Sequence, residues 1–188
     1  GVNAYAIYRN GALEVPYIAS LYSSIAAIIL PEVAKLFSKE KFGEIVQLKK
    51  KVITNTMMIT YPILIFLLFN SKELIVLYLG EKYEASAIIF AVFNLTLLMR
   101  VNSYTDILIA ANKSKLILYY NLLVFSVNAI LNYILIQQLG IIGAAISTVI
   151  SLFLFAVLLF SVSAKKIQAN WKSFFETKKI AQLLFFSL

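Results

Sequence analysis

The sequence predicts an all-α fold, a polytopic membrane helix bundle of about five complete transmembrane helices plus the start of a sixth. Of the 188 residues, 61% are hydrophobic and the mean hydropathy is +0.86, against roughly 45–50% apolar residues in a soluble domain. The apolar residues form continuous runs of about 20 residues, the length that a helix needs to cross a bilayer. A membrane barrel would instead give alternating segments of roughly ten residues.

The expected spans follow one another with short polar connections between them. They cover residues 15–37, 52–69, 85–111, 116–139 and 141–162, and a sixth begins at residue 180. The chain begins without Met and ends inside an apolar run. We therefore expect residues 1–188 to be a fragment of a longer protein.

Lysines are distributed unevenly among the connections. Segments 38–51, 112–115 and 164–179 carry twelve of them, Lys49 included, whereas segment 70–84 carries two and residues 137–143 none. By the positive-inside rule, the lysine-rich loops face the cytoplasm and segment 70–84 is an outer loop. The net charge of +8 then reflects topology and anionic lipid rather than a nucleic acid, because no basic segment outside the spans is interleaved with base-stacking aromatics.

Two connections have helical patterns of their own. Residues 42–52 place apolar side chains against charged ones, which is typical of an amphipathic helix lying on the inner membrane surface. Residues 73–79 predict a short apolar helix that Gly80 stops and that dips into the outer interface.

The residue types that are missing narrow the chemistry. The chain has no Cys and no His, so it has no disulfide framework, no thiolate metal site and no imidazole base. We expect no enzymatic activity, no cofactor and no metal. A membrane glycosyltransferase or polymerase is disfavoured because the nine acidic residues lie mostly in loops among lysines.

Arg100 is the most informative residue, because it lies near the centre of the third expected span. A charge at that depth costs on the order of 2.5–3.5 kcal/mol. On a continuous helix at about 100° per residue, Thr96, Ser103 and Tyr104 share its face. Four other polar residues of this span point elsewhere: Asn94, Asn102, Thr105 and Asp106. The counter-charge must come from another helix, a cavity water or a ligand, so a structural ion pair and a ligand-binding role both stay open.

The fourth and fifth spans carry neutral polar and small residues at helical spacing. One face of the fourth holds three asparagines, Asn121, Asn128 and Asn132. They predict either interhelical hydrogen bonds or one wall of a hydrated cavity for hydroxylated cargo. In the fifth, Gly143, Ser147 and Ser151 form a stripe of small residues that indicates close helix packing.

Several motifs in order resemble a known transporter family. They are NAYAIYRNGALEVPYIASLYSSIAAIILPEVAKLFSKEKFGEI (3–45), LYLGEKYEASAIIF (77–90), ILIAANKSK (107–115) and NAILNYILIQQLGIIGAAIST (128–148). This order is similar to that of the oligosaccharide flippases, the Wzx-type polysaccharide exporters of the multidrug/oligosaccharidyl-lipid/polysaccharide superfamily. The resemblance covers essentially the whole chain, which would match the C-terminal transmembrane lobe of a two-lobed protein.

The resemblance implies a function at the bacterial cytoplasmic membrane. Such proteins flip a polyprenyl-pyrophosphate-linked oligosaccharide to the outer leaflet by alternating access, for surface polysaccharide biosynthesis. The partners of this chain would be that substrate, membrane lipid and the N-terminal lobe of the same protein. Arg100 is then the leading pyrophosphate-binding residue and Arg9 a second cation nearer the exit. The asparagines of the fourth span and Tyr104 would meet sugar hydroxyls.

Three alternatives stay open. A cation- or proton-coupled multidrug antiporter needs a buried carboxylate, for which Asp106 and Glu32 are the candidates. A lipid II flippase shares the logic of a cationic cavity. A membrane scaffold subunit that transports nothing would pair Arg100 permanently with a carboxylate.

Overall fold

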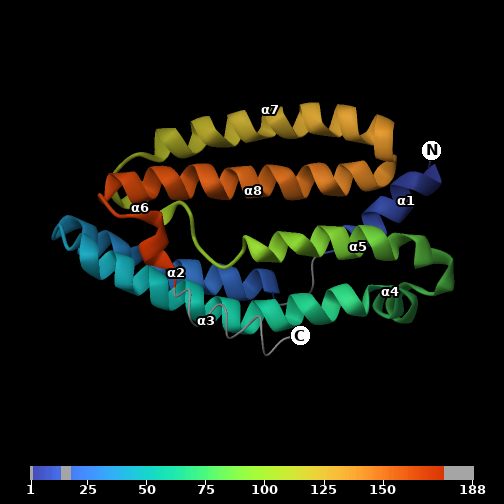
Figure 1. Cartoon of the computed structure of the whole chain (residues 1–188), viewed down its shortest axis with the longest axis horizontal. Coiled ribbons are helices and arrows are strands. Elements are labelled where there is room, and N and C mark those ends of the chain that lie inside the picture. The colour runs from blue at the N-terminus through green and yellow to red at the C-terminus, as the bar shows by residue number, and fades with distance from the viewer. Residues whose placement is uncertain (1, 14–17, 176–188) are drawn as a thin grey trace.

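The computed structural model describes residues 2–13 and 18–175, and within these ranges the chain is helical, with short turns and no strand (Figure 1). The α-helices in order are α1 (Val2–Gly11), α2 (Ile18–Ser38), α3 (Phe42–Phe69), α4 (Ser71–Leu79), α5 (Ala87–Asn94), α6 (Asp106–Ala110), α7 (Ser114–Leu139) and α8 (Ile141–Lys166). Three 3-10 helices accompany them, η1 (Glu81–Ser86), η2 (Leu95–Leu98) and η3 (Trp171–Phe174).

Four of the described helices, α2, α3, α7 and α8, are long and apolar enough to cross a membrane. Figure 1 shows α7 and α8 side by side as one antiparallel pair and α2 and α3 as another, with α5 and α6 between the pairs. The predicted polytopic helical bundle is therefore confirmed. The start of a sixth span, expected at residue 180, lies outside the described residues.

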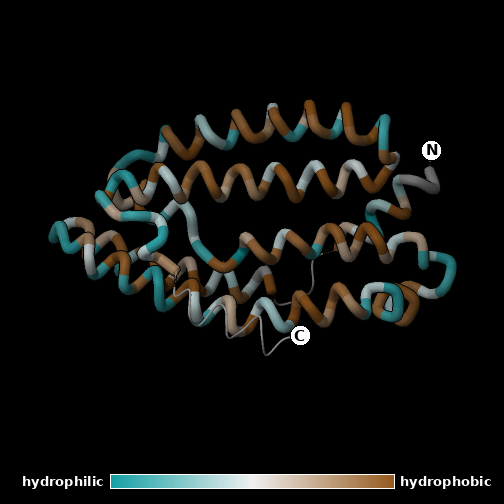
Figure 2. Tube along the Cα trace, viewed as in Figure 1, coloured by the Kyte–Doolittle hydropathy of each residue, from teal (hydrophilic) through white to brown (hydrophobic). Residues whose placement is uncertain are grey.

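The lysine-rich connections gather at one end of the bundle. The turns between α2 and α3, between α6 and α7, and after α8 all lie at the end drawn on the left of Figure 1, where Figure 2 is strongly hydrophilic. The turn between α7 and α8 and the segment that holds α4 lie at the opposite end. The lysine-rich and lysine-poor connections, which alternate along the sequence, thus lie at opposite ends of the bundle. The side of the membrane that each end faces stays a prediction.

The predicted amphipathic helix near residues 42–52 is the first part of α3 and continues into a spanning helix. Ile45 is fully buried and Lys49 is 1% exposed. The expectation of a separate helix on the membrane surface is therefore wrong, because this stretch packs into the core with residues of α2.

The third expected span, residues 85–111, is not a continuous helix. It consists of the last two residues of η1, then α5, the tighter η2, an irregular stretch at 99–105 and the five residues of α6. No Pro or Gly causes the break. The side-chain amide of Asn94 donates instead to the carbonyl of Phe90, and residues 102–106 read Asn-Ser-Tyr-Thr-Asp. The short polar side chains in this stretch, Asn, Ser, Thr and Asp, compete with the helical hydrogen bonds of the backbone.

The pair α7–α8 turns at Gly140, whose φ of 64° suits a residue without a Cβ. The helices then approach closely, because a Cβ on Gly143 would lie 2.2 Å from the carbonyl oxygen of Leu135. Ser147 and Ser151 are buried on the same face of α8. The predicted packing stripe is confirmed.

Candidate functional site: a polar cavity at the helix break

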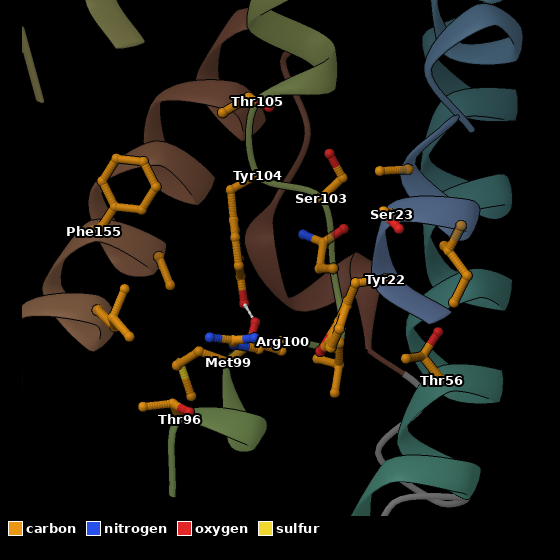
Figure 3. Close-up of a pocket in the computed structure, with 16 residues that line it drawn as sticks. Tyr22, Ser23, Thr56, Thr96, Met99, Arg100, Ser103, Tyr104, Thr105 and Phe155 are labelled. Carbon is orange, nitrogen blue, oxygen red and sulfur yellow. Dashed lines mark hydrogen bonds between the residues drawn. The ribbon is translucent and has the colours of Figure 1, made fainter. Parts of the chain in front are cut away.

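A cavity of about 470 Å³ opens beside the irregular stretch 99–105. Its volume falls in the range of roughly 300–1,000 Å³ that small-molecule sites occupy. Residues of α2, α3, α8, η2 and the irregular stretch form its wall (Figure 3). The polar lining residues are Tyr22, Ser23, Thr56, Thr96, Arg100, Asn102, Ser103, Tyr104 and Thr105.

The cavity lies about halfway along the spanning helices. Thr56 is near the middle of α3 (Phe42–Phe69), and Phe155 is near the middle of α8 (Ile141–Lys166). Arg100 therefore lies at mid-height of the bundle, as the sequence predicts, although the helix that was expected to carry it is broken at this point.

Arg100 and Tyr104 enter the cavity from the irregular stretch. Figure 3 shows them between Tyr22 and Ser23 of α2 on one side and Phe155 of α8 on the other. The Arg100 side chain is half-buried, and its guanidinium is a permanent cation with several N–H donors. An anionic group in this cavity would meet both that charge and the surrounding hydroxyl groups.

Two lining residues bring polar atoms that the described part of the chain leaves without partners. The hydroxyl of Tyr22 and both amide atoms of Asn102 are buried and have no hydrogen-bond partner there. Because buried polar groups are nearly always hydrogen-bonded, such atoms indicate a place for water or a ligand. The prediction that Asn102 and Thr105 point away from Arg100 is wrong, since all three line one cavity once the helix is broken.

The break frees backbone carbonyls, and side chains satisfy three of them. The Tyr104 hydroxyl donates to the carbonyl of Met99 at 2.6 Å, the ammonium of Lys49 to that of Ser103, and the Ser163 hydroxyl to that of Tyr104 at 3.3 Å. The last two donors come from α3 and α8. The irregular stretch is thus held in a defined shape from two sides.

Lys49 also forms a buried ion pair. Its ammonium lies 2.6 Å from a carboxylate oxygen of Asp106, and both side chains are 2% exposed. The other carboxylate oxygen accepts from the backbone N–H of Ile107 at 2.8 Å. The sequence places Lys49 among the loop lysines, which is wrong, and Asp106 has a partner on another helix. The cation-coupling role of Asp106 stays a prediction.

The other charged candidates lie outside the cavity. Arg9 is exposed on α1, which packs against α5 and η1 at the lysine-poor end of the bundle. Glu32 is partly exposed and lies 3.6 Å from the ammonium of Lys35 on the same helix. Neither Arg9 nor Glu32 is among the lining residues.

The three asparagines of α7 do not line the cavity either. Asn128 donates to the Ser151 hydroxyl of α8 at 3.1 Å, and Asn132 donates to Asn128 at 2.9 Å. Asn121 is exposed and bonds to the carbonyl of Ile117 in its own helix. Two of the three therefore make the hydrogen bonds between and along helices that one of the two interpretations predicts.

Among the described residues, no group of three or more His, Cys, Asp and Glu side chains is arranged to hold a metal ion. The described residues that line the cavity offer one cation, hydroxyl groups and an amide. This set of groups suits a phosphate and sugar better than it suits a metal.

Comparison with known proteins places these features in a family. A protein-family model described as "Lipid II flippase MurJ" matches residues 2–188. An uncharacterised membrane protein of Methanocaldococcus jannaschii is 29% identical over 160 residues, which are 82% of this chain and 31% of that protein. The chain thus spans about a third of the length of this relative.

Proposed function

The chain belongs to the lipid II flippase MurJ family, and we propose that it forms part of a transporter that flips a polyprenyl-pyrophosphate-linked saccharide across a membrane. In this proposal the cavity at the helix break receives the head group. Arg100 binds the pyrophosphate through charge-assisted hydrogen bonds, and the hydroxyl and amide groups around it contact the phosphates and the sugar.

One observation carries this proposal: the cavity lies halfway along the spanning helices, where a helix is broken and an arginine enters it. Irregular backbone at membrane depth is tolerated only where protein buries it or where it lines a cavity. In transporters, substrate sites near the midplane are typically formed by such discontinuous helices. An arginine that served only to hold helices together would not require a cavity of this size.

The family favours lipid II over an exported oligosaccharide as the substrate class. The matching family model names a lipid II flippase, whereas the sequence motifs resemble the Wzx-type exporters of the same superfamily. The superfamily prediction is thereby supported, and its lipid II alternative is supported better than its oligosaccharide reading. Both substrates present a pyrophosphate on a lipid, so the role of Arg100 is the same for both.

The alternatives from sequence have less support. An antiporter coupled through Asp106 needs that carboxylate to exchange a cation, yet it is paired with Lys49 and is not a lining residue. A scaffold subunit gives no reason for a polar cavity at mid-height. Within the proposal, the lysine-rich end faces the cytoplasm, a second lobe closes the cavity, and Arg9 is a cation nearer the outer exit.

Reconstitution tests the proposal directly. The full-length protein is placed in proteoliposomes that contain lipid II in one set and a polyprenyl-pyrophosphate-linked oligosaccharide in another. Head groups that reach the opposite leaflet are measured with an enzyme or label that cannot cross the membrane. We expect faster translocation of lipid II than in protein-free vesicles. Transport of the oligosaccharide alone would support the exporter reading, and transport of neither would contradict the proposal.

A further inference from the structure

We propose that Lys49 and Asp106 are positioning residues that form a buried clamp and set the shape of the cavity wall. The clamp joins α3 to the irregular stretch 99–105. It acts on the proposed site without touching the substrate, because neither residue is among those that line the cavity. Its relevance to transport rests on the proposed function, whereas its effect on the shape of the wall does not.

The clamp has three contacts that fix the end of the stretch. The Lys49 ammonium donates both to the Asp106 carboxylate and to the backbone carbonyl of Ser103. The Asp106 carboxylate in turn accepts the backbone N–H of Ile107. One ammonium therefore holds the last residues of the irregular stretch and the first residues of α6 against the same point of α3.

The contact between Lys49 and the Ser103 carbonyl affects the cavity wall because two lining residues are covalent neighbours of Ser103. Asn102 and Tyr104 flank it and both line the cavity, as Ser103 itself does. The amide of Asn102 has no partner in the described part of the chain. Its position is therefore set by the backbone, and the backbone is set by the contact of Lys49 with the Ser103 carbonyl.

The charges of Lys49 and Asp106 are better explained by a role in positioning the cavity wall than by a contribution to the stability of the fold alone. A buried ion pair adds little stability compared with apolar residues of similar volume, because both charges lose their hydration. What an apolar pair cannot do is donate a hydrogen bond to the freed carbonyl of Ser103. Removal of one charge strands the other, whereas removal of both leaves no unpaired charge but still leaves the carbonyl without its donor.

The test measures the wall itself by cysteine labelling, since the chain has no cysteine of its own. In the full-length protein, with any other cysteine replaced, Ser103→Cys reports on the clamped stretch and Ser23→Cys on the α2 side of the same cavity. Labelling rates with N-ethylmaleimide are compared in isolated membranes. Each reporter is combined with Lys49→Met/Asp106→Leu, which places no hydrogen-bond donor near the Ser103 carbonyl, and Lys51→Met provides a matched control because Lys51 is exposed on the same helix.

We expect the double variant to reach the membrane in normal amount and to change the labelling rate at position 103 several-fold, with position 23 unchanged, since only the clamped stretch gains freedom. Lys51→Met should change neither rate. Wild-type labelling at position 103 in the double variant would overturn the proposal, and so would an equal change at both reporters. If the double variant does not reach the membrane, Lys49→Arg is measured instead. It keeps the cation and alters its reach, so a changed rate at position 103 alone is expected and an unchanged rate overturns the clamp.

Transport measured in the same variants separates the two proposals. Labelling that shifts at position 103 together with slower flipping supports both. Labelling that shifts while the full-length protein transports no lipid-linked saccharide supports the clamp and contradicts the proposed function. Unchanged labelling in a protein that does flip the substrate contradicts the clamp alone.

Discussion

The hydroxyl of Tyr104 donates a hydrogen bond to the carbonyl of Met99 across 2.6 Å, so the end of the irregular stretch is tied back to its beginning. Arg100 follows Met99 directly and lies inside this closed turn. The geometry around the only arginine of the cavity wall is thus set by a side chain that itself lines the cavity. The Tyr104 hydrogen bond closes the irregular stretch on itself. The ammonium of Lys49 ties the end of that stretch to α3.

Tyr104→Phe removes the donor and keeps the ring. We expect a loss of stability of about 0.5–1.5 kcal/mol, because the part-buried carbonyl of Met99 loses its partner. The thermal midpoint of the solubilised full-length protein should fall, and transport should slow. Tyr119→Phe is the matched control, since that side chain on α7 is 61% exposed. Equal midpoints for Tyr104→Phe and the wild type would show that the hydrogen bond does not hold the turn.

Gly143→Ala tests the close approach of α7 and α8. The added methyl group would lie 2.2 Å from the Leu135 carbonyl oxygen, so the helices must separate, at a cost of about 1–3 kcal/mol. Gly43→Ala is the matched control, because Gly43 also lies on a helix and a Cβ added there would meet no atom within 4 Å. There we expect an unchanged or slightly raised thermal midpoint. An equal change of the thermal midpoint in Gly143→Ala and Gly43→Ala would contradict the close packing of α7 against α8.

Asn128→Ala removes the hydrogen bond that joins α7 to Ser151 of α8. We expect a loss of about 0.6–2 kcal/mol, as for other hydrogen bonds between membrane helices. Asn121→Ala should leave the thermal midpoint unchanged, because Asn121 bonds only within its own helix in the described contacts. If Asn121→Ala instead slowed transport while the midpoint held, the asparagine face would contact the cargo, as the second sequence interpretation predicts.

Membrane orientation is tested by accessibility from the two sides. Glu40 lies in the turn between α2 and α3, and Gln138 lies near the turn between α7 and α8. Both are exposed. With a thiol reagent that cannot cross the membrane, Gln138→Cys should react in intact cells and Glu40→Cys only after the cells are opened. The reverse pattern would invert the orientation that the lysines predict.

The sequence predicts the fold well where apolar runs decide it. The long runs that became α2, α3, α7 and α8 form continuous helices, because every backbone group in a membrane must be satisfied within the helix. The stripe at Gly143 was also predictable, since small residues four apart have one main use in such helices. These features depend on local sequence alone.

The site was predicted only in part, because its geometry depends on contacts that are distant in sequence. Arg100 lies at mid-height of the bundle as predicted, but the helix that carries it is broken where a continuous helix was expected. A cluster of polar residues after Val101, Asn-Ser-Tyr-Thr-Asp, of which all but the Tyr are short, was the available signal of a break. The pairing of Lys49 with Asp106 spans 57 residues, so no local pattern indicates the partner. The spacing of Lys49, four residues from both Ile45 and Ile53 on the buried face of α3, was the available signal that it differs from Lys50 and Lys51.

The positive charge of Arg100 is the central feature of the proposed transport site. The most direct measurement is the rate of lipid II translocation per molecule of full-length protein in proteoliposomes for Arg100→Lys, Arg100→Gln and Arg100→Ala, with Lys51→Gln as the control. We predict normal amounts of protein in the membrane, loss of transport in the Gln and Ala variants, and partial transport in the Lys variant, because Lys keeps the charge without the fork of donors. Wild-type rates in the Gln and Ala variants would contradict the account.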